Sequence, residues 1–220
     1  DSELSDLLSG RKGKLHVGGL RMGNLFLMPR LLRQYQQEYP EIDVILHEDT
    51  AQNLERLLCL GELDLIYANL RPTAPGLISH EVRQDHMLAV ISAQHPAAKR
   101  GRWLEGCHYP YLDLGQLENE DFYLMEPGRT IRGEVDAALK YAGVHPRKTH
   151  LITNIELGCQ MAAEGLGIAF TMESYLQDRS YPRPVQYFRV GDLTWYLSWR
   201  EGAYVPAYME YFITLLEKIA

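Results

Sequence analysis

Residues 13–68 decide the fold, and they read GKLHVGGLRMGNLFLMPRLLRQYQQEYPEIDVILHEDTAQNLERLLCLGELDLIYA. Apolar and polar residues alternate at the start, as in a short strand, and apolar residues then recur at helical spacing after a glycine-rich turn. The same change of period follows a second time before a last apolar run. We therefore expect, in order, a strand at 14–18, a helix at 23–39, a strand at 42–46, a helix at 50–60 and a strand at 63–68. Strands and helices that alternate in this way predict a parallel sheet with right-handed crossovers.

The ends of these elements carry residues that start and stop helices. Pro40 ends the first helix, and Asp49 or Thr50 is suited to cap the second, which Gly61 stops. The strands are short and mostly apolar, as expected when helices cover both faces of the sheet.

The second part of the chain repeats this alternation after prolines interrupt it at 72 and 75. We expect strands at 78–83, 86–92, 109–114 and 122–125, a helix at 130–142, a strand at 149–152, a helix at 154–164, strands at 167–171, 185–190 and 194–199, and a helix at 206–219. The pattern predicts two α/β units, with strand segments near 87–91 and 194–198 as the joins.

Composition argues against several classes of protein. The 220 residues are 46% hydrophobic and 23% charged, which is an ordinary globular composition. A net charge of −7 without any run of basic residues argues against direct nucleic-acid contact by this chain. Three dispersed cysteines, Cys59, Cys107 and Cys159, fit a reducing compartment better than a disulfide framework. The sequence shows neither a signal peptide nor the ~20 apolar residues of a membrane helix, so we expect a cytoplasmic location without membrane contact.

Signatures of common enzymes are missing from the sequence. It contains no G-x-S-x-G elbow, no phosphate-binding G-x-x-x-x-G-K-[ST] loop, no H-E-x-x-H and no C-x-x-C. The eight histidines fall singly, and each is better explained as a surface or core residue than as a metal ligand. We therefore expect no catalytic residues, no cofactor and no metal.

Ligands of open parallel sheets bind beyond the carboxyl ends of the strands, where loops run into helix N-termini. Helix N-termini carry free N–H groups and a partial positive charge, so they favour anions. Four strand-to-helix loops qualify, at 21–24, 49–52, 127–130 and 153–156, and Asn69, Arg71 and Thr171 also follow strand ends. Simpler roles remain open: Thr130 is suited to cap a helix, Arg129 to be a solvated charge, Arg71 to brace a loop, and the asparagines to form turns.

The order and spacing of several short segments are specific together, although each is weak alone. The segments are GKLHVG at 13–18, LMPRLL at 27–32, YPEIDV at 39–44, LLCLGELDLI at 57–66, HP at 95–96, AGVHP at 142–146 and MAAEGLGIA at 161–169. From about Gly10 to Ala220 the chain thereby resembles the effector-binding domain of LysR-type transcriptional regulators.

This resemblance implies an α/β fold like that of type 2 periplasmic binding proteins, with two Rossmann-like lobes joined by two crossover strands. Residues 13–88 and 193–220 would form lobe I, residues 89–192 an inserted lobe II, and residues 1–12 the end of a linker helix. The resemblance also implies a small-molecule effector in a cleft between the lobes, and homodimers that join into homotetramers. The N-terminal winged helix-turn-helix of the family would be absent from this chain, and DNA would be bound only through that missing part.

The pocket loops of the family fall on the loops already singled out by geometry. The predicted ligand-binding residues are Arg21, Met22, Gly23, Asn24, Thr50, Gln52, Asn69, Arg71, Gly128, Arg129, Thr130, Ile131, Asn154, Phe170 and Thr171.

Two positions depart from the family pattern. Family members often have Ser or Thr at the start of the first helix, where the hydroxyl bonds an effector carboxylate, whereas this chain has Met22 and Gly23. The usual Gly-Ile-x-x-x-Pro ending has Met172 in place of proline. Backbone N–H groups or Arg21 would have to bind an anion in place of the hydroxyl. We expect an anionic or an aromatic effector.

The sequence therefore predicts the effector-sensing domain of a LysR-type DNA-binding regulator, which relays ligand binding through a rearrangement of the oligomer. One alternative is a periplasmic solute-binding protein of a transporter, which an upstream signal peptide would reveal. Another is an enzyme that uses the same cleft, with Glu156 as its only evident carboxylate. An enzyme needs a positioned acid–base pair, and the sequence offers none.

Overall fold

The structure, a computed structural model, describes residues 12–176 and 180–220, so the linker-helix end expected at 1–12 lies outside the described residues except for Lys12. The chain divides into two compact units. Unit 1 comprises Asp1–Gln84 and Thr194–Ala220, and unit 2 comprises Asp85–Leu193.

Both boundaries fall inside long strands, β4 (Leu77–Ser92) and β8 (Val185–Arg200), so each strand has residues in both units. The sequence predicts two short strands in each place, and that expectation is wrong. Asp85 interrupts the apolar pattern of β4, yet it is buried and its carboxylate accepts a hydrogen bond from the backbone N–H of Ser174. The extended backbone therefore continues through a position that looks like a break.

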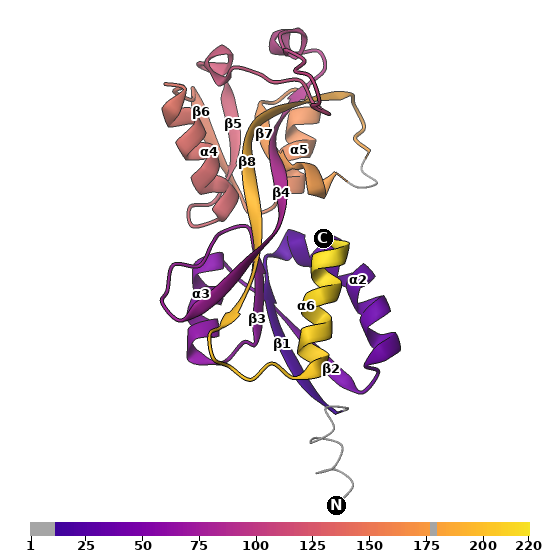
Figure 1. The fold of residues 1–220 in the computed structure, drawn as a ribbon. Coiled ribbons are helices and arrows are strands. Elements are labelled where there is room, and N and C mark those ends of the chain that lie inside the picture. The colour runs from indigo at the N-terminus through magenta and orange to yellow at the C-terminus, as the bar shows by residue number, and fades with distance from the viewer. Residues whose placement is uncertain (1–11, 177–179) are drawn as a thin grey trace, which may run out of the picture. The chain divides into compact units, whose positions relative to one another are not determined.

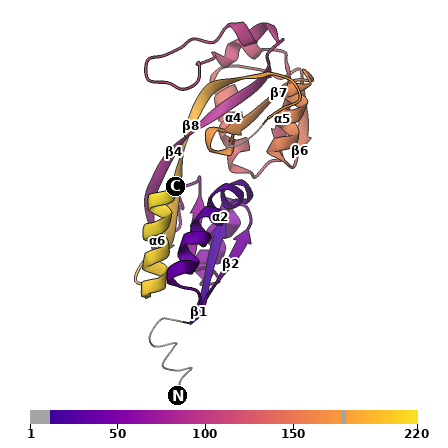
Figure 2. The same ribbon diagram turned by 90° about the vertical axis from the view of Figure 1, so that its right-hand side faces the viewer.

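Unit 1 is built on parallel strands β1 (Gly13–Gly19), β2 (Ile42–Glu48) and β3 (Leu65–Ala68), with β1 in the middle. The order continues with β8, antiparallel to β3, and then β4. Helices α2 (Arg21–Glu38) and α6 (Ala207–Ile219) cover one face, and α3 (Ala51–Leu60) covers the other (Figure 1). Figure 2 shows α6 beside α2, where the Tyr35 hydroxyl donates a 3.1 Å hydrogen bond to the Tyr208 carbonyl.

The two faces of β1 carry different residues because side chains alternate along a strand. Leu15 and Val17 are fully buried on the α2 face. Gly18 points toward α3, where a Cβ atom would lie 2.7 Å from a methyl group of Leu63 and 2.8 Å from one of Leu54. The missing side chain at Gly18 thus lets the apolar core beneath α3 approach the sheet.

Unit 2 repeats the parallel arrangement with β5 (Asp121–Met125) between β6 (Lys148–Ile152) and β7 (Ile168–Met172). Its order is β8-β4-β7-β5-β6, with β4 antiparallel to β7. Helices α4 (Thr130–Tyr141) and α5 (Ile155–Ala163) lie on opposite faces of this sheet (Figure 1). Among the helices that the structure describes, none is long and apolar enough to cross a membrane.

The expectation of a strand at 109–114 is wrong. Tyr111 forms an isolated bridge with Arg102 that closes a loop. The chain then turns into the short 3₁₀ helix η2 (Leu114–Leu117). The Asp113 carboxylate caps this helix by accepting a hydrogen bond from the Gly115 N–H. Pro110 has no N–H to give to a ladder, and the Asp113 cap favours a turn, so these residues do not extend a sheet. Two further 3₁₀ turns are η1 (Pro96–Lys99) and η3 (Glu173–Tyr175).

We expect Gly18→Ala to lower the free energy of unfolding of the chain by about 1–2 kcal/mol, because the added methyl group overpacks the core beneath α3. Gly13→Ala in the same strand is the control, since a Cβ there has its nearest neighbour at 3.7 Å. Urea denaturation followed by circular dichroism measures both. Equal stability of the two variants would contradict this account of Gly18.

Candidate functional site

The carboxyl ends of β1, β2 and β3 lie at one edge of the unit 1 sheet. Gly19, the last residue of β1, pairs with Glu48 of β2 and with Tyr67 of β3. The loops and the first helical turns at this edge hold the predicted residues of unit 1: Arg21, Met22, Gly23, Asn24, Thr50, Gln52, Asn69 and Arg71. The structure thus brings this half of the predicted set to one edge.

Helix α2 begins at this edge without a side-chain cap. Its N-cap residue is Leu20, and within the described part of the chain no side chain caps this end. The first helical bond runs from the Asn24 N–H to the Leu20 carbonyl, so the N–H groups of the three residues before Asn24 belong to the open first turn. That turn has no acidic residue, and Arg21 is exposed on it. The end of α2 is therefore suited to a negatively charged group.

Asn24 is a buried polar residue in the first turn of this helix. Its side chain is buried, 4% exposed, against Gly19, where any Cβ atom would overlap the Asn24 amide. Neither Oδ1 nor Nδ2 of Asn24 has a hydrogen-bond partner among residues 12–176 and 180–220, and the same holds for Oδ1 of the buried Asn69. A buried polar group without a partner costs about 1–3 kcal/mol, so these atoms are available to bond an ordered water molecule or a ligand.

Gly23 explains why the usual hydroxyl is missing. A Cβ atom at this position would lie 2.7 Å from the indole ring of Trp195, which stacks on Tyr67 with ring centroids 4.6 Å apart. A side chain at position 23 therefore has no room. The packing of Trp195 against the helix is long-range, so the sequence pattern around Gly23 could not reveal it.

Helix α3 begins at the same edge but is already capped. Thr50 Oγ1 accepts a 3.3 Å hydrogen bond from the N–H of Asn53, and Asp49 accepts from the N–H of Thr50 and from the Asn53 amide. The Asp49 carboxylate gives this helix end a negative charge that disfavours an anion. Gln52 is exposed on the first turn of α3.

The loop that carries Arg71 is tied to α3. Glu55 Oε1 accepts hydrogen bonds from the backbone N–H groups of Thr73 at 3.0 Å and Ala74 at 2.6 Å. Arg71 itself is exposed. The tether fixes the backbone of the loop, while the Arg71 guanidinium stays accessible to a ligand.

Unit 2 has a corresponding edge at the carboxyl ends of β5, β6 and β7. Arg129 is the N-cap residue of α4, and no side chain in the described ranges caps this helix. The expectation that Thr130 caps it is wrong, because Thr130 is the first helical residue. Its Oγ1 atom is buried and has no partner within the described residues. Gly128, at φ +89°, makes the left-handed turn before the helix.

Asn154 behaves differently, because it caps its own helix. Its Oδ1 atom accepts a 2.9 Å hydrogen bond from the N–H of Glu156 at the start of α5. Asn154 is exposed, so it lies at the loop edge, but its acceptor is already engaged in the cap.

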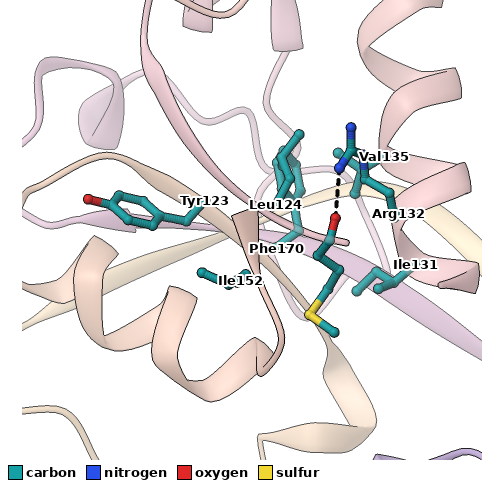
Figure 3. A pocket seen from close by; sticks show the side chains of 8 residues that line it. Tyr123, Leu124, Ile131, Arg132, Val135, Ile152 and Phe170 are labelled. Carbon is teal, nitrogen blue, oxygen red and sulfur yellow. Dashed lines mark hydrogen bonds between the residues drawn. The ribbon is translucent and has the colours of Figure 1, made fainter. Parts of the chain in front are cut away.

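Ile131 and Phe170 line a small, mostly apolar hollow inside unit 2. Figure 3 shows this hollow, where Arg132 Nη1 donates a 2.7 Å hydrogen bond to the Met125 carbonyl at the end of β5. Arg132 also pairs with Asp136 at 2.8 Å. The Arg132 side chain is only 16% exposed, and its bond to Met125 joins α4 to the end of β5. Its spacing of four from Asp136 is the signal that could have indicated pairing.

Thr171 lies in the core. It is 2% exposed, and its side chain shares a hydrogen bond with the Cys159 thiol of α5. Burial raises the pKa of the Cys159 thiol to about 11, although the hydrogen bond with Thr171 acts in the opposite direction. Thr171 thus supports the packing of α5 on β7. Phe170 is also buried and stacks on Phe122 with centroids 6.0 Å apart.

The chain has two α/β units, and in each the parallel strands end in loops that lead into helix N-termini. This architecture is that of a binding domain with the type 2 periplasmic-binding-protein-like fold. Residues 9–220 match the model of the LysR substrate binding domain, and the chain belongs to this family. The predicted fold class and the family resemblance are confirmed.

Solved structures support the fold. The CcmR regulatory domain of Synechocystis PCC6803 in complex with 2-PG has a TM-score of 0.81 at 20% identity, covering 94% of this chain and 97% of that one. The BenM effector binding domain with its effector benzoate has a TM-score of 0.77 at 19% identity, covering 94% of this chain and 91% of that one.

Curated relatives are transcriptional regulators. A probable RuBisCO transcriptional regulator of Trieres chinensis is 23% identical over 86% of this chain and 61% of its own length. The DNA-binding transcriptional dual regulator OxyR of Escherichia coli K12 is 25% identical over 71% of this chain and 48% of its own length. The chain therefore spans about half to three fifths of the length of these relatives.

We expect Asn24→Ala to leave the free energy of unfolding of the ligand-free chain unchanged or slightly raised, because the substitution breaks no hydrogen bond. The matched control is Asn154→Ala, which removes a helix cap and should cost about 1 kcal/mol. Chemical denaturation compares the two. A loss at Asn24 as large as the loss at Asn154 would show that the Asn24 amide is already bonded.

Proposed function

We propose that this chain is the effector-sensing domain of a LysR-type DNA-binding transcriptional regulator. The family match over residues 9–220 and the regulators among the relatives support this. They do not favour a solute-binding protein of a transporter. The proposal assigns the chain a binding function without turnover, and a cytoplasmic location where the regulator reaches DNA.

One observation carries the binding function: within the described residues, the N-terminus of α2 has no side-chain cap, and the buried Asn24 amide next to it has no hydrogen-bond partner. An acidic or strongly polar group of the effector would accept from the first N–H groups of α2 and attract Arg21. The Asn24 amide offers both a donor and an acceptor, and Asn69 Oδ1 adds an acceptor. In unit 2, the Thr130 hydroxyl lies at the start of α4 and has no partner in the part of the chain that the structure describes, so it is the candidate for a hydrogen bond to an effector.

The proposal keeps the division expected from the family resemblance, with residues 13–88 and 193–220 as lobe I and 89–192 as an inserted lobe II. DNA would be bound by a further part of the full-length regulator, which acts as a homodimer or homotetramer. Effector binding shifts the populations of two oligomer arrangements in proportion to its difference in affinity for them. The sign of this affinity difference decides whether the effector activates or represses transcription.

The binding site is tested with small anions as probes. Benzoate, 2-PG and a panel of organic acids are screened by thermal shift, and the strongest hit is titrated by calorimetry. We expect Arg71→Ala to weaken its affinity about tenfold, the loss of one hydrogen bond to a charged group. Thr130→Ala removes a neutral hydrogen bond and should weaken it less.

Arg33→Ala is the control, because it removes the same charge from the exposed surface of α2, well beyond its first turn. Its affinity should equal that of the unmodified chain. If neither Arg71→Ala nor Thr130→Ala changes the dissociation constant, the predicted residues do not form the site.

A further inference from the structure

A hollow of about 310 Å³ lies beside helix α4 in unit 2. It is lined by Leu124, Arg132, Asp136, Leu139, Lys140, Gly143, Val144, His145, Pro146 and Thr149. Small-molecule sites have volumes of roughly 300–1,000 Å³, so the hollow has room for one small molecule. None of the residues predicted to bind the effector lines it. The hollow is therefore separate from the proposed effector site, and an inference about it does not depend on the proposed function.

The turn that ends α4 forms part of the wall of this hollow. Gly143, at φ +67°, reverses the direction of the chain there. Its N–H donates a 3.1 Å hydrogen bond to the Lys140 carbonyl, and the Val144 N–H donates a 2.9 Å hydrogen bond to the Leu139 carbonyl. The last carbonyl groups of a helix repel an anion when they are free. At this helix end, main-chain N–H groups occupy these two carbonyls and fix the shape of the wall.

The apolar part of the lining comes from both the sheet and the helix. Leu124 of β5, Leu139 of α4 and Val144 of the following turn are 3%, 5% and 6% exposed. Pro146 adds a further apolar ring. A hydrocarbon chain placed against these side chains would leave water without stripping a polar group of its hydrogen bonds. This part of the hollow is therefore suited to the apolar body of a ligand.

Charged groups of the lining are paired within the chain, with one exception. Arg132 Nε lies 2.8 Å from each carboxylate oxygen of Asp136, so these two charges offset each other. The His145 ring faces Glu118, with 3.3 Å between Nδ1 and Oε1. The Lys140 ammonium, in contrast, has no carboxylate within 4.0 Å among residues 12–176 and 180–220. The hollow thus has one positive charge without a counter-charge.

We propose that this hollow binds a small organic monoanion, a carboxylate with an apolar body. The carboxylate pairs with the Lys140 ammonium, and the body lies against Leu124, Leu139 and Val144. A cation would be repelled by Lys140, and a neutral molecule would gain nothing from its charge. The ligand class therefore follows from the single unpaired charge beside an apolar surface.

The test titrates hexanoate, as the probe, into the ¹⁵N-labelled chain and follows the backbone amide signals by NMR. We expect saturable shifts at Gly143, Val144 and Thr149. Hexanamide, which lacks the charge, should bind about fivefold more weakly, as expected for one exposed ion pair. Propionate, which is three methylene groups shorter, should bind about tenfold more weakly. The amide signals of Asn24 and Thr130 report separately on the proposed effector site.

Lys140→Gln should lower the affinity for hexanoate about fivefold and leave the affinity for hexanamide unchanged, because the substitution removes only the charge. Lys148→Gln is the matched control, since Lys148 is also exposed but does not line the hollow. It should bind hexanoate like the unmodified chain. The proposal is overturned by the absence of saturable shifts around the hollow, by equal affinities for hexanoate and hexanamide, or by undiminished hexanoate affinity in Lys140→Gln.

Discussion

The close approach of the Trp195 indole to Gly23 decides how helix α2 begins at the candidate site. Trp195 is fully buried, stacks on Tyr67 at the end of β3, and carries the Arg83 guanidinium 5.7 Å from its ring centroid. A side chain at position 23 would displace this wall, so α2 begins without a hydroxyl. An anion bound at this end, as we propose, would therefore contact main-chain N–H groups, whose direction is set by the helix itself.

The helices that follow the parallel strands differ in whether a side chain caps their first turn. Thr50 and Asn154 satisfy the starts of α3 and α5 from within the chain, so a ligand there would have to displace an existing bond. Within the described residues, no side chain caps the start of α2 or of α4, and each start has buried polar side-chain atoms without a partner, on Asn24 and on Thr130. A ligand gains the most binding free energy where it supplies hydrogen bonds that the fold lacks. This difference separates the predicted loops at 21–24 and 127–130 from those at 49–52 and 153–156.

Sequence reasoning succeeded where neighbouring residues decide the structure. The Thr50 cap, the left-handed Gly61 that ends α3 and the parallel order of β1, β2 and β3 all follow from local signals and crossover rules. It failed where distant residues decide. The continuity of β4 through Asp85 depends on Ser174, far along the chain, and the bare start of α2 depends on Trp195. The sequence could therefore place candidate residues at one edge of each sheet, but could not tell which helix starts were open.

Strand β1 has different roles on its two faces because its side chains alternate. Gly19 supports the Asn24 amide on the α2 face, while His16 and Gly18 face α3. On the α3 face, Gly18 leaves room for Leu54 and Leu63, and His16 lies 3.0 Å from His47 of the neighbouring strand. The pairing of β1 with β2 on one side and with β3 on the other resists movement of the strand. The same layer of main chain therefore fixes both the core beneath α3 and the surface against which the Asn24 amide lies.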